Sequence, residues 1–334
     1  MCGLAGFIQR DGSAADVRRL GAMIACLAHR GPDDEGVELR GRVAMGHRRL
    51  SIVDLSPAGH QPMNGPDSST LIAYNGEVYN HRSLRERLGS GPEYRGGSDT
   101  EVVARVLATR GAEGLALLNG IFALAWLDEA RGELLLARDQ FGIKPLYFAE
   151  DGERFYFASE VKAIVAGGLS AAAEPLAPLD FAYTGWTADE RTFLRGVRRL
   201  PPGSFLRYEL SSGRWRVERY FTPAPDVERA RGLGERYGAW KDAVREQLER
   251  TIEAQLMSDV PVGTFCSGGI DSSLVTAMAA RRHGTMLAFN VTCPDSPALD
   301  EGPYARAVAR HVGVELRTLE LTQCPRLPPC HTRR

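Results

Sequence analysis

The chain has 334 residues, and 41 basic against 42 acidic side chains leave a net charge of −1. With 43% hydrophobic and 25% charged residues, the composition predicts a globular protein of about two domains and excludes disorder as its main state. The charge balance argues against a nucleic-acid surface, and the sequence shows neither a long apolar run nor a signal-peptide pattern, so we expect no membrane span and a cytoplasmic location.

The first 165 residues predict short strands interrupted by two helices. A compact apolar run predicts a buried strand at residues 3–8, and apolar residues at helical spacing predict a helix at 16–28. Further strands are expected at 43–47, 51–54, 71–74, 122–128, 134–138, 146–149 and 155–159. A second helix is expected at 100–109, with a capping residue in Ser98-Asp99. Many strands with two helices predict stacked sheets covered by helices, an α+β architecture.

The second half of the chain has a different organisation. Residues 169–179 and 223–234 are expected to be linkers. They are followed by a long helix at 240–257, and then by strand 260–265, helix 272–280, strand 286–291 and helix 304–312. This alternation predicts a parallel sheet with only two strands, which is too few to close a core.

The last residues, 323–334, read QCPRLPPCHTRR and show no periodicity. We expect an aberrant tail, and therefore a truncated or frame-disrupted second domain; a natural tail is the alternative.

The six cysteines form no CxxC pair, which argues against a zinc site and a disulfide framework. Cys2 follows the initiator Met1. Removal of Met1 would leave an α-amine, with a pKa of about 8, beside the thiol of the same residue. An amine in that position can act as the base that activates a nucleophile, so Cys2 is a candidate catalytic residue.

Several sequence blocks accompany Cys2 in a fixed order. Over the first 101 residues they are MCGLAGF, HRGPDDEG, HRRLSIVDL, GHQP, YNGEVYN and GSDTE, and RDQFGIKPLYF, FASEVKAI and RRLPPGSFLRY continue to about residue 208. This set resembles the class II glutamine amidotransferase domain, an N-terminal-nucleophile domain found at the front of asparagine synthetases. The resemblance implies an N-terminal-nucleophile fold with stacked antiparallel sheets.

The resemblance also implies a glutamine site. Glutamine is a zwitterion, and Arg49 matches the family position that binds its carboxylate, while Asp99, with Glu77 nearby, matches the position that binds its ammonium. The wall of the pocket corresponds to Arg49, Leu50, Ser51, Ile52 and Val53. The Asn75 side chain and the Gly76 N–H match the oxyanion hole, whose donors stabilise the tetrahedral intermediate.

Each of these residues also has a simpler interpretation. Asn75-Gly76 is a common hairpin-turn signal, Asp99 could be a helix cap and Arg49 a surface charge. The ordered blocks behind Cys2 favour the functional interpretation. His29 and His47 are not needed as bases, and we interpret both as structural.

A second motif, SGGIDSS, lies between a predicted strand and a predicted helix. Such a Gly-rich turn exposes backbone N–H groups and a helix N-terminus that can hold phosphate, although a plain strand-to-helix turn is the alternative. It matches neither the P-loop pattern GxxxxGK[ST] nor the dinucleotide-binding fingerprint GxGxxG. Together with the preceding SDVPVG it resembles the pyrophosphate loop of ATP pyrophosphatases.

That resemblance implies an ATP site. The loop residues that would hold the pyrophosphate are Ser267, Gly268, Gly269, Asp271, Ser272 and Ser273. Asp271 would bind Mg²⁺ in an incomplete site, Val291 would pack against adenine, and Phe265 is a candidate second wall. The family usually has two aliphatic residues before the loop, whereas this chain has Phe265-Cys266, so we expect altered packing around the nucleotide.

Both motifs together resemble glutamine-dependent asparagine synthetase to about residue 320. The expected organisation is an amidotransferase domain at 2–210, a linker at 211–238, the start of an α/β parallel-sheet nucleotide-binding domain at 239–322 and the tail at 323–334. The implied reaction converts ATP, L-aspartate and L-glutamine into L-asparagine, L-glutamate, AMP and diphosphate. We expect this chain to be limited to glutamine hydrolysis, because family members run well beyond its length.

Two alternatives stay open: a tailoring amidotransferase that acts on another carboxylate, and a non-catalytic remnant. The expected partners are the small-molecule substrates and, as an open option, a second copy in a homodimer, with no nucleic acid and no membrane.

Overall fold

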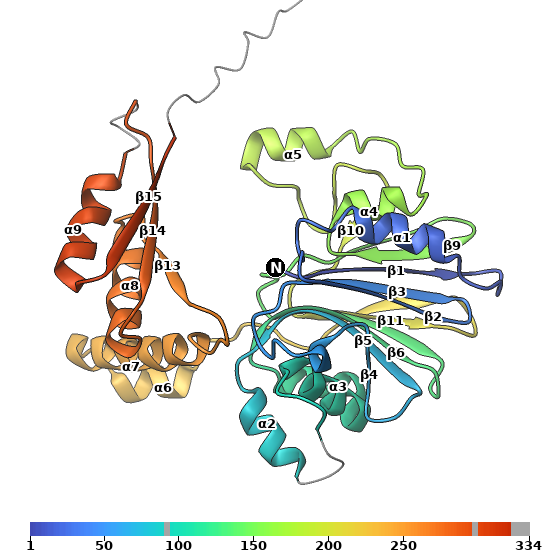
Figure 1. Ribbon diagram of the computed structural model, residues 1–334, viewed down its shortest axis with the longest axis horizontal. Coiled ribbons are helices and arrows are strands. Elements are labelled where there is room, and N and C mark those ends of the chain that lie inside the picture. The colour runs from blue at the N-terminus through green and yellow to red at the C-terminus, as the bar shows by residue number, and fades with distance from the viewer. Residues whose placement is uncertain (90–93, 296–299, 322–334) are drawn as a thin grey trace, which may run out of the picture. The chain divides into compact units, whose positions relative to one another are not determined.

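A computed structural model describes residues 1–89, 94–295 and 300–321 of the chain. It divides into two compact units, Met1–Pro225 and Asp226–Arg334, each of which is described here by itself (Figure 1). The tail expected at 323–334 lies outside the described residues.

The first unit contains two six-stranded antiparallel sheets. The first sheet has the order β10 (Arg198–Arg199), β8 (Tyr147–Glu150), β9 (Arg154–Ala158), β1 (Gly3–Gln9), β3 (Val43–Arg49) and β2 (Asp34–Arg40). The second has the order β12 (Trp215–Arg219), β11 (Ser204–Glu209), β7 (Glu133–Arg138), β6 (Gly120–Asp128), β5 (Thr70–Val78) and β4 (Met63–Asn64). β1 and β5 therefore each lie inside a sheet, with a strand on both sides.

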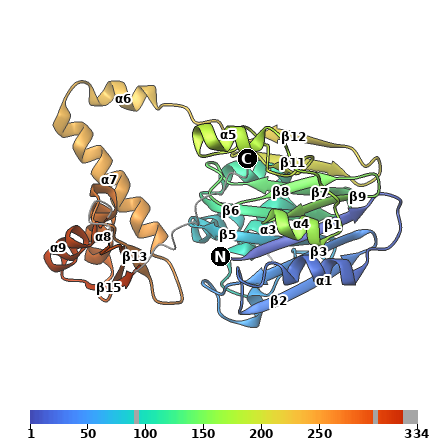
Figure 2. The ribbon, with the colours of Figure 1, turned by 90° about the horizontal axis from the view of Figure 1, so that it is seen from above.

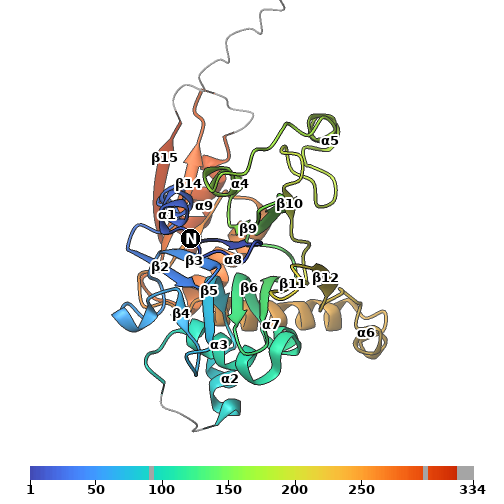
Figure 3. The same ribbon diagram turned by 90° about the vertical axis from the view of Figure 1, so that its right-hand side faces the viewer.

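Helices cover the outer faces of both sheets, which gives four layers (Figure 3). α1 (Val17–Ala25) and α4 (Val161–Ala166) lie across the sheet of β1, β3 and β9, as the view in Figure 2 shows. α2 (His81–Leu88) and α3 (Asp99–Arg110) cover the second sheet. The remaining helices of this unit are α5 (Ala177–Thr184) and the 3-10 helices η1 (Pro57–Gly59) and η2 (Gly111–Leu117).

The residue pattern of β1 explains why the layers form. Leu4 and Ile8 point into the core between the sheets, whereas Ala5 and Phe7 pack on the other side against α1. Every one of these side chains is fully buried, as expected for a strand with a hydrophobic layer on each face. The α+β architecture of stacked antiparallel sheets is thereby confirmed.

One predicted strand is wrong. Residues 51–54 form no strand, because the chain turns there and Asp54 adopts a φ of +58°. The carbonyls of Val53 and Asp54 accept hydrogen bonds from the Arg49 guanidinium instead of from a neighbouring strand. The apolar residues that suggested a strand belong to a loop wrapped around a charged group.

The segments expected to be linkers contain regular structure. α5 begins within 169–179, and α6 (Val227–Leu233) lies within 223–234. The wider linker expected at 211–238 also includes β12, which pairs with β11.

The second unit is a small α/β arrangement. It consists of α6, α7 (Tyr237–Gln255), β13 (Gly263–Phe265), α8 (Ile270–Arg282), β14 (Leu287–Thr292), α9 (Gly302–Val312) and β15 (Glu315–Glu320). The three strands form a parallel sheet in the order β13-β14-β15, so the expectation of two strands is corrected to three. Its buried core is small and centres on Cys266, Ala288 and Ala305.

Candidate active site

One cavity of the first unit gathers most of the residues that the sequence assigns to glutamine. It lies where the start of β1, the end of β3, β5 and the start of α3 meet. Its lining residues are Cys2, Arg49, Leu50, Ile52, Val53, Gln61, Tyr74, Gly76, Glu77, Ser98, Asp99 and Thr100. Two predicted residues are not among them: the Ser51 N–H donates to Asp33 Oδ2 at 2.8 Å, and Asn75 lies on β5 beside Gly76.

The Cys2 thiol is held against the loop that follows β3. The Leu50 N–H donates to Cys2 Sγ at 3.4 Å, and the thiol contacts the Leu50 carbonyl at 3.6 Å. Burial raises the pKa of the Cys2 thiol, so the neutral thiol is its resting form and a base is needed to activate it. Arg30 fixes the same residue from the other side, because its Nε donates to the Cys2 carbonyl at 2.8 Å and its Nη1 to Glu160 at 2.9 Å.

Arg49 ends β3 and is buried, so the interpretation as a surface charge is wrong. Its guanidinium donates to the carbonyls of Val53, Asp54 and Ser56. A Cβ on Gly59 would collide with this guanidinium, which explains a glycine at that position. The loop thus holds a fixed cation beside the cavity, which suits a carboxylate.

Asn75 and Gly76 lie within β5 and pair with Ala123 and Phe122 of β6, so the hairpin-turn interpretation is also wrong. Asn75 is 1% exposed, and its Nδ2 has no hydrogen-bond partner among the described residues. Leaving a buried donor unpaired costs about 1–3 kcal/mol, so this amide is suited to an acceptor supplied by a ligand. A Cβ on Gly76 would collide with the Ile121 carbonyl, so only glycine fits there.

Glu77 and Asp99 form an acidic pair in the cavity. Asp99 is the first residue of α3, but the cap is Ser98, and Asp99 Oδ2 instead accepts from the Tyr74 hydroxyl and the Val78 N–H, each at 2.9 Å. Burial raises the pKa of both carboxyl groups, and the charge of Asp99 raises that of Glu77 further. A bound cation would relieve this cost, so the pair suits an ammonium group.

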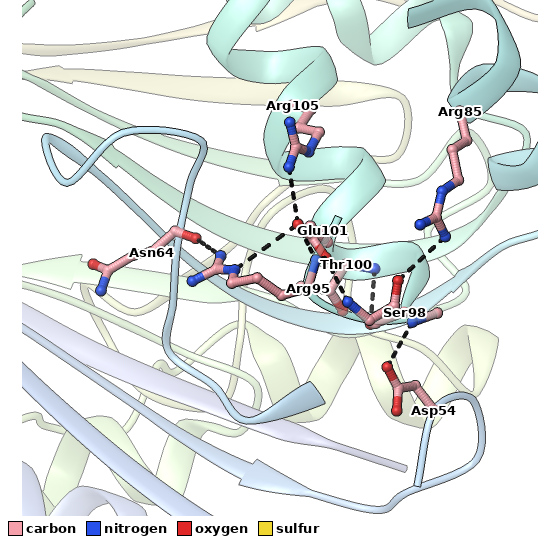
Figure 4. A network of polar contacts seen from close by, with 10 residues as sticks. Asp54, Asn64, Arg85, Arg95, Ser98, Thr100, Glu101 and Arg105 are labelled. Carbon is pink, nitrogen blue, oxygen red and sulfur yellow. Dashed lines mark hydrogen bonds and ion pairs between the residues drawn. The ribbon is translucent and has the colours of Figure 1, made fainter. Parts of the chain in front are cut away.

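A network of polar contacts fixes the start of α3 and with it Asp99 (Figure 4). Glu101 accepts from the backbone N–H groups of Arg95 and Gly96 and from Arg105 Nη2 at 3.1 Å. The Gly97 N–H donates to Asp54 at 2.7 Å, which joins this segment to the loop around Arg49.

Three buried residues near the cavity received no role from the sequence: Arg30, Gln61 and Lys144. Each lies in one of the ordered sequence blocks, so the blocks could have identified these residues as candidates but not their roles. Gln61 Oε1 accepts from the Tyr74 N–H at 2.7 Å, and its Nε2 donates to Thr100 Oγ1 at 3.3 Å. Burial lowers the pKa of Lys144, and the nearby Glu77 and Cys2 oppose that effect.

His29 and His47, the two histidines interpreted as structural, contact other parts of the first unit. His29 Nε2 lies 2.9 Å from Glu160 Oε1, and His47 Nε2 lies 2.8 Å from the Tyr74 carbonyl. Burial lowers the pKa of His47 to about 4, so its ring is neutral at pH 7 and donates to that carbonyl.

In the second unit, residues 267–273 follow β13 and comprise the turn before α8 and the first turn of α8 itself, so the motif extends into the helix rather than lying before it. Gly269 is the N-cap of α8 and has no side-chain cap bond. The hydroxyls of Ser267 and Ser272 lie 3.0 Å apart, and Ser273 Oγ donates to the Gly269 carbonyl at 2.6 Å. Gly268 has a φ of +95°, which a residue with a side chain rarely adopts.

Phe265 and Val291, the candidate adenine walls, are both exposed, and the register of β13 and β14 puts them on the same face of the sheet. Cys266 is fully buried on the opposite face. Asp271 lies in the first turn of α8. Within 1–89, 94–295 and 300–321, no three His, Cys, Asp or Glu residues are grouped as a metal site. No helix in this part of the chain is long and apolar enough to cross a membrane.

Comparisons with known proteins agree with both halves of this description. A family model described as "Glutamine amidotransferase domain" matches residues 1–221, and one described as "Asparagine synthase" matches residues 243–325. The chain is 32% identical to amidase chyE of Penicillium rubens, covering 97% of this chain and 51% of that protein. It is also 32% identical to asparagine synthetase B of Escherichia coli, covering 96% of this chain and 54% of that protein.

The chain thus spans about half the length of these curated relatives. Among solved structures, glutamine phosphoribosylpyrophosphate amidotransferase of B. subtilis is similar in fold, with a TM-score of 0.51 and 17% identity over 95% of this chain and 65% of that one.

Proposed function

The chain belongs to the glutamine amidotransferase domain family, and on that premise we propose that its first unit hydrolyses glutamine to glutamate and ammonia, with Cys2 as the nucleophile. The observation that supports this most is the cavity itself. It places the Cys2 thiol near a buried cation, Arg49, and the acidic pair of Glu77 and Asp99, with the unpaired Asn75 amide beside it.

In the proposed reaction, Arg49 binds the glutamine α-carboxylate, and Asp99 with Glu77 binds the α-ammonium. Once Met1 is removed, the Cys2 α-amine takes the thiol proton, and the sulfur attacks the side-chain amide carbon. The oxyanion that forms accepts hydrogen bonds from Asn75 Nδ2 and the Gly76 N–H. Ammonia then leaves with a proton from the α-amine, and water hydrolyses the thioester to release glutamate.

For the second unit we propose ATP binding at the loop of Ser267, Gly268, Gly269, Asp271, Ser272 and Ser273. The loop offers backbone donors and the N-terminus of α8 to phosphate groups. Asp271 would share a Mg²⁺ ion with the phosphate oxygens, as single carboxylates often do. Phe265 and Val291 would border the adenine.

The acceptor of the ammonia is proposed to be L-aspartate, activated by ATP, in line with the similarity to asparagine synthetase B. A second candidate is another carboxylate, and the similarity to amidase chyE favours it. We propose that this chain alone shows glutamine hydrolysis with little amide product. Its second unit has a small core, and Asp271 is the one carboxylate within residues 267–273.

The decisive experiment replaces the nucleophile. Cys2→Ala removes one buried sulfur, so the fold should persist while glutamate formation falls by more than about 10³-fold. Cys26→Ala is the matched control, because Cys26 is also partly buried but belongs to the end of α1. Chains that retain Met1, identified by intact mass, should be inactive as well. Wild-type rates in Cys2→Ala would overturn the proposal.

A further inference from the structure

We propose that Gln61 is a positioning residue that completes the edge of β5, so that the Gly76 N–H stays turned into the cavity as an oxyanion donor. This inference rests on the proposed glutamine hydrolysis and adds a residue that the reaction scheme above does not use.

The edge of β5 loses its neighbouring strand just before the site. β4 pairs with β5 only at two positions, Met63 with Ile72 and Asn64 with Leu71. In an antiparallel strand, each residue directs its N–H and its C=O to the same neighbouring strand, and successive residues alternate between the two neighbours. Beyond Ile72, the groups of Tyr74, Gly76 and Val78 therefore face the side that β4 no longer covers, while Asn75 faces β6.

Side chains take the place of the missing strand. Gln61 Oε1 accepts from the Tyr74 N–H at 2.7 Å, and His47 Nε2 donates to the Tyr74 carbonyl at 2.8 Å. Two positions further along, Asp99 Oδ2 accepts from the Val78 N–H at 2.9 Å. Gly76 stands between these two occupied positions and lines the cavity. The edge thus presents the Gly76 N–H to a ligand while its neighbours are held.

Gln61 suits this place because its amide carries one acceptor and one donor on a neutral group. The acceptor holds Tyr74, and Nε2 donates to Thr100 Oγ1 at 3.3 Å, next to Asp99 at the start of α3. Gln61 is 4% exposed and Thr100 is 2% exposed, so water does not replace either bond readily. Gln61 therefore joins the strand of the oxyanion donors to the helix of the ammonium ligand.

The expected effect falls on the chemical step. An oxyanion forms only after attack, so a misplaced Gly76 N–H weakens the transition state more than the bound substrate. Removal of Gln61 should therefore lower kcat and leave KM nearly unchanged, whereas loss of a substrate ligand would raise KM.

The test compares Gln61→Met, which keeps the length of the side chain and removes both bonds, with the wild-type chain. We expect kcat for glutaminase to fall about 10–100-fold, with KM within about threefold. The matched control is Asn80→Leu, because the Asn80 amide likewise makes one bond as donor and one as acceptor: its Nδ2 donates to Leu117 O and its Oδ1 accepts from Asn119 N. This control should lower Tm but keep kcat within about threefold.

A second, milder variant keeps the test valid if Gln61→Met does not fold. Thr100→Val removes only the far anchor of Gln61, and it should lower kcat several-fold at constant KM. In the Gln61→Met background, the same change should have no further effect on kcat, because Thr100 is expected to act through Gln61.

The results separate the two proposals. If wild type hydrolyses glutamine, Cys2→Ala does not, and both Gln61→Met and Thr100→Val keep the wild-type kcat, this inference is wrong while the proposed function stands. Equal losses of kcat in Asn80→Leu and Gln61→Met would also overturn it, because they would reduce Gln61 to a general contributor to stability. If wild type itself forms no glutamate, the proposed function fails first.

Discussion

Glu77 and Asp99 show how burial destabilises a carboxylate and how a ligand of opposite charge could offset that effect. Burial raises the pKa of both carboxyl groups, and the charge of Asp99 raises the pKa of Glu77 further. In the proposed site, the glutamine ammonium supplies the compensating charge, and Arg49 supplies the partner for the carboxylate.

The first prediction removes one charge at this site. Asp99→Asn keeps the shape and weakens a charge-assisted bond worth about 1.5–3 kcal/mol, so KM for glutamine should rise about 10–150-fold. Arg49→Met should act in the same direction through the substrate carboxylate. Steady-state glutaminase kinetics measure both effects. An unchanged KM in Asp99→Asn would exclude Asp99 as the ammonium ligand.

His47 gives a prediction on stability and pH. Burial lowers its pKa in the folded protein from 6.5 to about 4, so between these pH values the unfolded chain binds a proton that the folded chain does not. Stability should therefore fall as pH falls from about 6.5 towards 4, by up to roughly 3 kcal/mol from this residue.

The measurement for His47 is urea unfolding of wild type and His47→Gln at pH 7 and pH 4.5. Other groups titrate in both proteins, so the difference between the two chains isolates the histidine. If wild type and His47→Gln lose equal stability on acidification, His47 is not the buried neutral base described here.

At the scale of elements, buried strands are easier to predict from the sequence than exposed ones. The interiors of β1, β6 and β7 are apolar and buried, and the predicted strands agree with them within a residue or two. β2 and β15 were missed because they carry charges: their sequences are DEGVELR and ELRTLE, and each lies at the edge of its sheet. An edge strand meets water on one side, so its pattern resembles that of a loop.

The sequence predicts only part of the candidate site. Residues with distinctive chemistry in an ordered block, such as Cys2 and Arg49, were found in one cavity. Gln61 also lines this cavity, but the sequence does not predict it, because its role depends on two bonds to segments that follow it in the chain by 13 and 39 positions, and no local pattern encodes these bonds.

The turn between β13 and α8, where we propose that ATP binds, gives a prediction at the scale of elements. A Cβ on Gly268 would lie 2.6 Å from the Ala305 backbone nitrogen, and the φ of +95° is strained for any L side chain. Gly268→Ala should therefore destabilise the second unit by about 1–3 kcal/mol and weaken any ATP binding. Gly284→Ala is the control, because a Cβ there meets nothing within 4 Å. Thermal unfolding with and without ATP–Mg²⁺ distinguishes them, and equal Tm values would contradict the prediction.

At the scale of the whole molecule, the two units differ in how well they are packed. The first unit contains three large cores, whereas α7 in the second has no buried residue and Val244 is 54% exposed. Hydrophobic stabilisation follows buried apolar area, so the first unit holds most of it.

The corresponding prediction is that residues 1–225, expressed alone, fold and hydrolyse glutamine within about threefold of the rate of the whole chain. All three cores and the entire cavity lie within this segment. Circular dichroism and a glutamate assay on the purified fragment provide the test. A fragment that folds but lacks activity would show that the second unit contributes to the site.

The position of Cys2 beside β1 has a consequence for protein synthesis. β1 pairs with β3 on one side and with β9 on the other, where Ala5 lies opposite Ala158. The ribosome makes Cys2 long before it makes that partner, so β1 cannot pair with its second neighbour until β9 has emerged. The thiol that we propose as the nucleophile is therefore exposed on the nascent chain while the walls of its cavity are still being translated. A chain released before β9 would carry this thiol without the buried surroundings of the folded protein.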